Sequence, residues 1–376
     1  MFWQYEYERE GVAMTLNNTY QLDLPKSGLL GSLLLRFSGS DVSGLGTTGG
    51  EWRLLDFISK IEVMLDTSTP CKSITGKQAA ALQVYDQGHI GPSAWRNYAS
   101  NTQFEYLLIN FGRWLHDPNV GIDLARYNNV KLQITNDAAA ADLSDISVSV
   151  LKVLLRDAPS SNFLGYLRTE EWRRWTTVQA ETIYSELPTE HRLRRIGLFA
   201  QPPVDGSNVE GTGMANLMED IDLSLDTGQI RVYKGGIDDL MRLNGFDLWG
   251  SLITGGQWYG NVDVGFDVGL GYVEAGAWGS GSADGAVSTT VPTLESGRTS
   301  FTQKAESFEA DSPINFLMKG QAPHNLAMYR FDPDPDPATW LDPNARKTVK
   351  LDIKTRDASS AAGGTNAIVL DRFVRY

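Results

Sequence analysis

Short apolar runs rich in β-branched and aromatic residues alternate along the chain with clusters of Gly, Pro, Asn and Asp. This alternation is typical of β-strands joined by turns. Helical periodicity is confined to two short pieces, residues 76–85 and 236–243. The pattern predicts a mostly β protein whose strands fall into two series. The first series is 20–24, 29–37, 57–65, 104–111, 130–135 and 147–155, and the second is 176–187, 193–200, 221–225, 326–331, 349–354 and 367–374.

Phrases from the first series recur in the second series in the same order. Leu24-Pro25 and the leucines after it recur at Leu187-Pro188, 163 positions later. The strand and turn at 61–67 recur at 221–227, 160 positions later, and both lead into one of the predicted helices. Self-similarity in a fixed order indicates a duplicated architecture.

A third phrase, which includes loop residues, makes chance similarity between two β segments a poor explanation. The stretch from Asp117-Pro118 to Arg156 recurs without a gap from Asp336-Pro337 to Arg375, 219 positions later. Three collinear matches of this kind favour duplication of one β module. We therefore expect two tandem copies.

The rise in spacing between the copies, from 160 to 219, locates an insertion in the second copy at residues 244–300. The inserted stretch is rich in Gly and contains Trp249, Trp258 and Trp278. Apolar residues alternate strictly over 262–272, which predicts a strand with one buried face. We interpret the insertion as an ordered excursion, with a Gly-rich linker as the alternative.

Length and composition agree with a two-domain globular protein. The 376 residues suffice for two cores, and 41% hydrophobic with 21% charged residues is ordinary for a soluble domain. The formal net charge of −13 opposes direct binding of nucleic acid, which relies on Lys and Arg. Cys71 is the single cysteine, so neither an intrachain disulfide nor a thiolate metal cluster can form.

Targeting signals are not visible in the sequence. The first ten residues lack the basic and apolar regions of a signal peptide. The apolar stretch at 29–35 is much shorter than the roughly 18 residues that a membrane-spanning helix needs. We expect synthesis in the cytoplasm and a soluble or peripheral protein.

The search for catalytic or cofactor motifs yields little. The four histidines have no zinc-ligand spacing, and no Gly-x-Ser-x-Gly elbow supports a Ser-His-Asp triad. Residues 44–49 match the Gly-x-Gly-x-x-Gly fingerprint, but a clear helix does not follow them, so a surface loop is the better interpretation. We therefore predict no catalytic residue, no cofactor and no metal.

One acidic loop requires a comparison with calcium loops. Asp332, Asp334 and Asp336 alternate with prolines at a spacing similar to a calcium-binding loop. The sixth position is Pro337 instead of Gly, and the twelfth is Pro343 instead of Glu. A rigid, solvated loop is favoured, and calcium remains the alternative.

The N-terminal segment is unusually aromatic. Phe2, Trp3, Tyr5 and Tyr7 fall within seven residues, and unburied aromatic surface is a liability for a free tail. We predict that this segment docks on another subunit or on an underlying membrane. Packing on its own barrel is the alternative.

A basic phrase stands out against the acidic chain. Arg192, Arg194 and Arg195 are candidates for contact with an anionic lipid or a neighbouring subunit. The alternative is a local salt-bridge cluster with nearby acidic residues such as Glu170 and Glu190.

The two collinear copies, the insertion and several phrases of the first copy together carry a resemblance to a known family. The phrases are residues 110–113, 121–123 and 127–130. In order and length they resemble the double jelly-roll major capsid proteins of tailless icosahedral viruses of bacteria or archaea, which often carry an internal membrane. Order and length carry the resemblance, since none of these phrases is a diagnostic signature.

The resemblance implies an all-β fold of two tandem eight-stranded antiparallel jelly-roll barrels with short helices between strands. Residues 1–18 would be an N-terminal arm, 19–160 the first barrel, and 161–376 the second barrel with 244–300 as an outer tower loop. The strand expected at 176–187 lacks an equally long partner before Leu24. The boundary between the copies is therefore expected within 158–167.

The resemblance also implies a structural protein of the virion and not an enzyme. Three chains would give a homotrimeric, pseudo-hexagonal capsomer of six barrels, which then contacts neighbouring capsomers. Minor or vertex capsid proteins and an internal lipid membrane would be further partners, with no direct nucleic acid.

Two alternatives belong to other functional classes. A carbohydrate-binding or host-attachment protein would expose the tryptophans of the insertion. A two-jelly-roll glycan-processing enzyme would place carboxylates in the cleft between the barrels.

Overall fold

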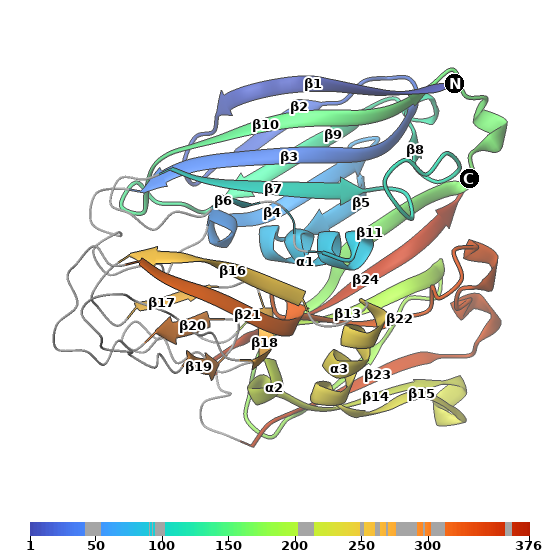
Figure 1. Cartoon of the computed structure of the whole chain (residues 1–376). Helices are drawn as coiled ribbons and strands as arrows, with labels where there is room; N and C mark the ends of the chain where they lie inside the picture. Colours follow the sequence, from blue (N-terminus) through green and yellow to red (C-terminus); the bar gives the residue numbers. More distant parts are fainter. Residues whose placement is uncertain are drawn as a thin grey trace.

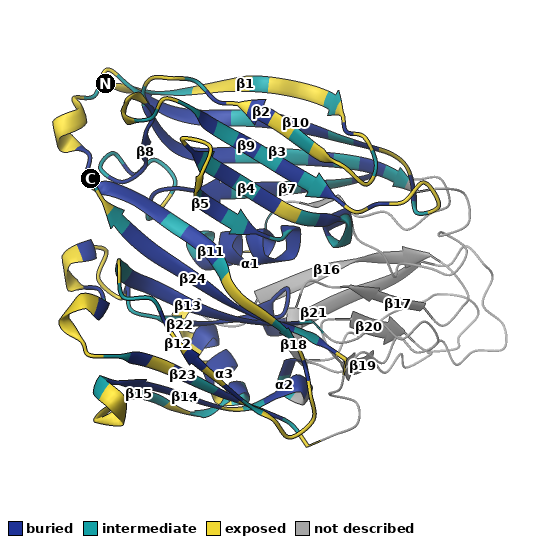
Figure 2. Ribbon diagram, turned by 180° about the vertical axis from the view of Figure 1, so that it is seen from behind, coloured by how far each residue is buried: buried dark blue, intermediate teal, exposed yellow. Residues whose placement is uncertain are grey.

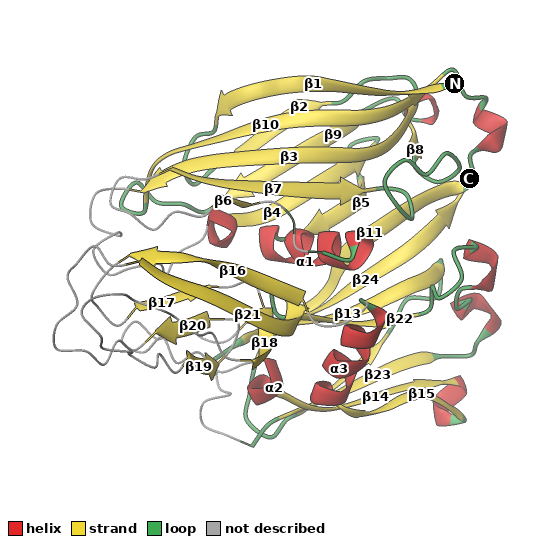
Figure 3. Cartoon of the chain, viewed as in Figure 1, coloured by secondary structure: helices red, strands yellow, loops and turns green. Residues whose placement is uncertain are grey.

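The computed structural model of the chain describes residues 1–41, 54–89, 91, 93–94, 102–201, 214–248, 252–259, 264–267, 270–275, 292–295, 298–301, 313–357 and 363–376. Strands dominate these residues (Figures 1 and 3). The α-helices of the described part are short: α1 (Gly76–Gln87), α2 (Met214–Leu217) and α3 (Ile237–Asp247).

The first half of the chain forms a barrel of two antiparallel sheets. Its strands are β1 (Phe2–Ala13), β2 (Thr19–Asp23), β3 (Leu29–Asp41), β4 (Ile58–Leu65), β5 (Thr69–Ile74), β6 (Ser93–Ala94), β7 (Thr102–Asn110), β8 (Ile122–Asp123), β9 (Val130–Asn136) and β10 (Leu143–Arg156). One sheet has the order β1-β10-β3-β7, with the short strands β6 and β8 beside it, and the other has the order β2-β9-β4-β5. The first and last strands of the module are thus neighbours, as in a jelly roll.

The second half repeats this arrangement. Its strands are β11 (Gly165–Thr176), β12 (Thr182–Glu186), β13 (Arg192–Gln201), β14 (Met218–Leu225), β15 (Ile230–Gly236), β22 (Leu326–Arg330), β23 (Val349–Thr355) and β24 (Thr365–Arg375). They pair in the orders β11-β24-β13-β22 and β12-β23-β14-β15. The two copies share the same order of four long strands in each sheet, which confirms the prediction of two tandem antiparallel jelly rolls.

The duplication extends to the pairing register. Leu65 of β4 lies opposite Val130 of β9, and the corresponding Leu225 of β14 lies opposite Val349 of β23. Alternate residues of β9 and of β23 are buried, so each strand turns one face to a core. The same apolar period therefore builds the same contact twice.

The arm expected at residues 1–18 is instead the edge strand of the first barrel. β1 pairs with β10 from Phe2–Arg156 to Ala13–Ser147, and β11 pairs with β24 in the same way. The backbone donors and acceptors of β1 that face β10 are paired along the strand, while its outer edge stays open. β1 is the counterpart of β11, which sequence comparison missed because the two share pattern and not letters.

The strand predicted at 176–187 is wrong as a single element. β11 ends at Thr176 and β12 begins at Thr182, with Ala180 in the left-handed region at φ 53° between them. Such a backbone conformation belongs to a turn. The first module ends with β10 at Arg156 and the second begins with β11 at Gly165.

The insertion contributes small sheets of its own. Its strands are β16 (Leu252–Tyr259), β17 (Val264–Asp267), β18 (Leu270–Ala275), β19 (Pro292–Glu295), β20 (Arg298–Phe301) and β21 (Pro313–Pro323). They form two three-stranded sheets, β16-β21-β18 and β17-β20-β19, at the end of the molecule opposite both termini (Figure 1). The excursion therefore begins after α3 and continues through β21, beyond the predicted limit.

Some sequence expectations on loops are only partly covered by the structure. The single strand predicted over 262–272 is wrong, because β17 and β18 belong to different sheets. Trp249, Trp278 and the Gly-rich motif at 44–49 lie outside the described residues.

The two barrels are joined by one parallel strand contact. β5 of the first barrel pairs with β11 of the second, Lys72 opposite Thr169 and Ser73 opposite Glu170. As a result, one sheet of each barrel merges into a continuous sheet of eight strands, β2-β9-β4-β5-β11-β24-β13-β22. Helix α1 lies beside this contact, between the barrels, and is largely buried (Figure 2).

The second barrel's core offers a direct test of the fold. Leu351 of β23 is buried, whereas its neighbour Lys350 is exposed. We expect Leu351→Ala to lower the free energy of unfolding by about 2–5 kcal/mol, because it leaves a cavity. Lys350→Ala should change it by less than about 0.5 kcal/mol. Denaturant unfolding measures both, and equal effects would contradict the assigned strand faces.

Candidate functional site

Two arginines of β13 lie in the interior, between the barrels. The exposed fractions of Arg194 and Arg195 are 3% and 2%. Successive side chains of a strand normally point to opposite faces. Here the pairing of β13 with β24 is irregular between Leu193 and Arg195, and such a bulge lets both guanidinium groups reach the same group of carboxylates.

These guanidinium groups bind three carboxylates. Arg194 Nε lies 2.8 Å from Asp332 Oδ2, and its Nη1 lies 3.2 Å from Asp371 Oδ2. Arg195 Nη1 lies 2.7 Å from Asp86 Oδ1, and its Nη2 lies 3.1 Å from Asp332 Oδ2. We call Asp86, Arg194, Arg195, Asp332 and Asp371 the inter-barrel network.

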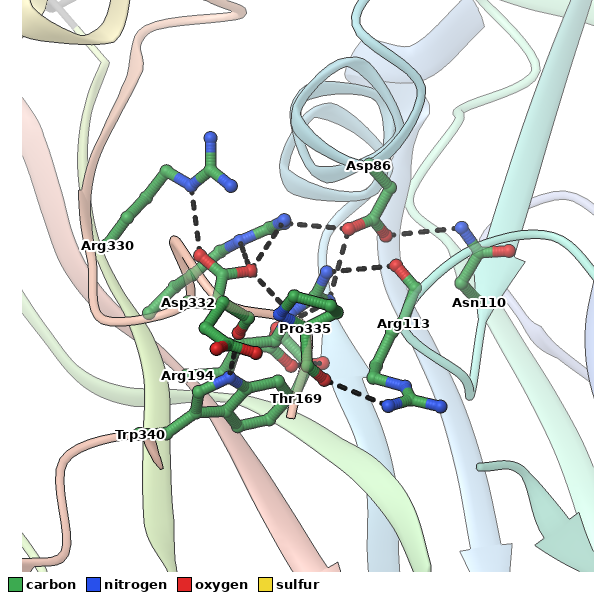
Figure 4. A network of polar contacts seen from close by, with 12 residues as sticks. Asp86, Asn110, Arg113, Thr169, Arg194, Arg330, Asp332, Pro335 and Trp340 are labelled. Atoms are coloured by element: carbon green, nitrogen blue, oxygen red, sulfur yellow. Dashed lines mark hydrogen bonds and ion pairs between the residues drawn. The ribbon is translucent and has the colours of Figure 1, made fainter. Parts of the chain in front are cut away.

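The network crosses from one barrel to the other. Asp86 is on α1 of the first barrel, where it also accepts a hydrogen bond of 3.2 Å from Asn110 Nδ2. Arg194 Nη2 donates to the carbonyl of Arg113 at 3.0 Å, and Arg330 Nε lies 2.9 Å from Asp332 Oδ1 (Figure 4). The buried charges therefore bind the second barrel to the first at this position.

A second chain of contacts joins the paired strands themselves. Lys72 Nζ of β5 donates to Thr169 Oγ1 of β11 at 2.6 Å. Thr169 Oγ1 in turn donates to Asp371 Oδ1 at 2.8 Å. The parallel backbone contact and the charge network thus meet at Asp371.

Burial and charge act in opposite directions on these groups. Burial alone would raise the pKa of Asp332, but Arg195, Arg194 and Arg330 outweigh it and hold that pKa well below its usual range. The pKa of Asp86 is also lowered, because Arg194 and Arg195 outweigh its desolvation. Burial lowers the pKa of Lys72, against the attraction of Asp371.

The enclosed space inside the network is small, whereas a more open pocket of about 590 Å³ beside it is lined by residues that include Asp86, Asp247 and Arg330. A cavity of about 20 Å³ is lined by charged residues that include Lys72, Asp86, Arg194 and Asp371. That volume is comparable to one water molecule and too small for a sugar ring. The carboxylates that lie between the described parts of the barrels are engaged by arginines, so this junction gives no support to the glycan-processing alternative.

The prediction that Arg194 and Arg195 contact lipid or a neighbouring subunit is wrong, because both are enclosed within the chain. Arg192 is different: it is partly exposed, lies 3.2 Å from Asp342 Oδ2 and donates to the carbonyl of Pro337 at 3.2 Å. Its role as a contact residue stays a prediction. The sequence feature that could have indicated the burial of Arg194 and Arg195 is the apolar run that follows them in the same strand.

The alternative of a local salt-bridge cluster is right that Arg194 and Arg195 form ion pairs but wrong about their partners, which are Asp86, Asp332 and Asp371 and not Glu170 or Glu190. Glu170 and Glu171 pair instead with other basic residues. Arg174 Nη2 lies 2.7 Å from Glu171 Oε2, and Arg168 Nη2 lies 2.8 Å from Glu170 Oε2. Arg372 also contacts Glu170. These pairs are local to β11 and β24.

The acidic loop is organised by its own backbone and by arginines. Asp334 Oδ1 accepts from the amide of Asp336 at 2.8 Å, and Asp336 Oδ1 accepts from the amide of Ala338 at 2.9 Å. Asp332 turns away into the inter-barrel network. Within the described ranges, no group of three or more His, Cys, Asp or Glu is placed to hold a metal ion. The interpretation of a rigid, solvated loop fits Asp334 and Asp336, which are exposed, but not Asp332, which is buried.

The N-terminal aromatics line an open sheet edge. Phe2, Tyr5 and Tyr7 are exposed on β1. Trp3 is partly buried and lies beside His116, with ring centroids 5.1 Å apart, and Tyr5 also contacts His116. The backbone of β1 pairs with its own barrel, while the side chains of Phe2, Tyr5 and Tyr7 remain exposed to solvent. Their contact with a subunit or membrane stays a prediction.

In the described part of the chain, none of the helices has the length and hydropathy to cross a bilayer. Cys71 is buried on β5, and burial raises the pKa of its thiol to about 12. The thiol therefore stays protonated at neutral pH.

The geometry defines a double jelly roll, and major capsid proteins of several viruses have this fold. The chain is similar to the STIV MCP of Sulfolobus Turreted Icosahedral Virus, with a TM-score of 0.60 and 10% sequence identity over 100% of this chain and 97% of that chain. It is similar to the PBCV-1 virus capsid, with a TM-score of 0.55 and 10% identity over 99% and 94%. It is also similar to the major capsid protein of Bacteriophage PM2, with a TM-score of 0.52 and 10% identity over 100% and 98%.

No family model and no curated protein sequence matches the chain. The likeness to solved structures covers both barrels, so it shows the fold of the whole chain. It confirms the all-β double jelly roll expected from the duplicated sequence.

The inter-barrel network is expected to make the free energy of unfolding depend on pH in the acid range. A carboxyl whose pKa is lowered by folding contributes stability above its unfolded pKa of about 3.9, and this contribution is lost as the pH falls toward the folded value. We expect Asp332→Asn to cost about 3–5 kcal/mol at neutral pH, because it leaves arginines short of a partner. It should also flatten the loss of stability below about pH 4.

The matched control is Asp334→Asn, an exposed residue of the same loop. Unfolding free energies measured across the acid range separate the two variants. An acid profile of Asp332→Asn that equals that of the unsubstituted chain would contradict the assignment.

Proposed function

We propose that this chain is the major capsid protein of an icosahedral virus, a structural protein without catalytic activity. The observation that carries the proposal is the pair of jelly rolls joined by a continuous eight-stranded sheet. Its full-length likeness to the PM2 and STIV capsid proteins supports it. A rigid pair of similar barrels is a suitable building unit for a shell.

The capsomer of this proposal is a homotrimer. Three chains with two similar barrels each form a ring of six barrels, whose outline is nearly hexagonal although its symmetry is threefold. Such tiles pack closely side by side. The repeated strand register supports this arrangement, because it makes the two barrels alike in shape.

The orientation in the shell follows from the two ends of the molecule. Both termini lie at one end and the strands of the insertion at the other (Figure 1). In the proposed orientation the insertion projects outward as the tower, and the end with the termini faces inward. The exposed Phe2, Tyr5 and Tyr7, together with Arg192, are then candidates for contact with a neighbouring subunit or an internal lipid membrane.

The remaining partners follow from charge and location. The net charge of −13 disfavours direct contact with the genome. The protein would be made in the host cytoplasm and reside in the virion shell, with neighbouring capsomers and minor or vertex proteins as contacts.

Solution mass tests the proposed capsomer. We expect light scattering to give three times the mass of one chain, and negative-stain microscopy to show particles of nearly hexagonal outline. A strict monomer at micromolar concentration would count against the capsid function.

The N-terminal strand is expected to be needed for assembly. Deletion of residues 1–10 removes most of β1 and should prevent normal particles, because it strips an edge of the first barrel and the exposed aromatics. Phe2→Ser with Tyr5→Ser and Tyr7→Ser keeps the strand and tests the side chains alone. Normal particles from both variants, counted by electron microscopy, would show that the segment has no assembly role.

A further inference from the structure

The junction inside the chain uses parts that the chain carries twice. β5 of the first barrel pairs with β11 of the second, and α1 packs beside them. By position in the duplicated module, β15 is the counterpart of β5, β1 of β11, and α3 of α1. Of these counterparts, β5, β11 and α1 form the junction inside the chain.

The other members of these pairs, β15, β1 and α3, do not form such a junction in the described part of the chain. In the described part of the chain, β15 pairs with β14 and β1 pairs with β10, so each presents an open edge. Open edges of this kind are ready to pair with another chain, and proteins usually cover or block them. β1 is long and is not blocked by proline.

The helices show the same contrast in burial. Ten of the twelve residues of α1 are buried, because the helix lies between β4 and β7 of its own barrel and residues of the second barrel such as Asn244 and Leu326. In α3, Leu243 and Phe246 are 50% and 83% exposed. The equivalent positions of α1 are covered. Exposure of large apolar side chains on α3 therefore indicates a protein-binding surface.

We propose that the open edge of β15 and the exposed face of α3 bind the β1 edge of a second copy of this chain, and so repeat the β5–β11 junction between subunits. This inference rests on the proposed function and specifies which surfaces join the capsomer. The proposed partner is a second copy of this chain, because its β1 is the counterpart of β11, the strand that pairs with β5 in the internal junction.

The template fixes the register of the contact. Lys72 lies opposite Val63 in the first barrel as Tyr233 lies opposite Leu223 in the second. Tyr233 therefore takes the place of Lys72.

On the partner strand, Thr169 lies opposite Asp371 as Glu6 lies opposite Lys152, so Glu6 takes the place of Thr169. In the intersubunit contact, Tyr233 is then opposite Glu6, and the next pair is Lys234 opposite Tyr7.

Charge on the two edges is complementary. β15 carries the exposed cations Arg231 and Lys234, whereas β1 carries the exposed carboxylates Glu6 and Glu10 and one exposed cation, Arg9, so its exposed charge is net negative. Opposite charges across an interface favour one partner and one register. The contact joins two different surfaces head to tail, so three chains close a ring with three internal and three intersubunit junctions.

Cysteine cross-linking of the full-length chain tests the register. Glu6→Cys combined with Tyr233→Cys should give covalent dimers and trimers on a denaturing gel after mild oxidation, because paired strands place such residues within disulfide reach. Each single variant should give none, and the buried Cys71 should not compete. The matched control is Glu6→Cys with Lys350→Cys, which lies on a central strand of the same sheet.

A trimer that forms but does not cross-link in the paired variant, or that cross-links equally in the control, overturns this inference and leaves the proposed function intact. A monomeric unsubstituted chain overturns the proposed function itself. The two failures are therefore distinguishable.

A second variant tests the helix face without new disulfides. Phe246→Asp should weaken the trimer about tenfold or more in dissociation constant while the unfolding of the chain is unchanged, because Phe246 is exposed in the single chain. Val178→Asp, at another exposed apolar residue, is the control. Equal trimer stability in both variants would overturn the role of α3.

Discussion

The parallel contact between β5 and β11 is the constraint on which the arrangement of the molecule depends. It is the point where a sheet of the first barrel becomes a sheet of the second, so the strands of both barrels share one continuous hydrogen-bonded layer. Because a continuous sheet resists hinge motion, we expect the two barrels to move together as one unit. The proposed capsomer requires such a unit.

Buried charge reinforces this contact and makes it specific. Arg194 and Arg195, both buried, bind carboxylates from both barrels. Desolvation makes such groups costly when unpaired, so the network is favourable only when α1, β13 and the loop with Asp332 meet in one geometry. The network therefore selects one relative placement of the barrels more than it adds net stability.

Duplication explains why the two copies differ where they do. The strands that build each core keep the same register, because the apolar face of each must meet its own barrel. The copies diverge at surfaces with different surroundings: α1 is covered within the chain, while α3 is open. The insertion occurs after α3 and not after α1, at the end far from the termini.

The sequence by itself determined most core strands, the duplication and the double jelly roll, because period-two burial and turn residues act over short distances and repeat visibly in the letters. It did not reveal that β1 is the counterpart of β11, since β1 is a sheet edge while β11 is paired on both sides, and the different surroundings select different side chains. It also misplaced Arg194 and Arg195 on the surface. A charged residue is buried only when distant residues such as Asp86, Asp332 and Asp371 converge on it, and that convergence is decided by tertiary structure alone.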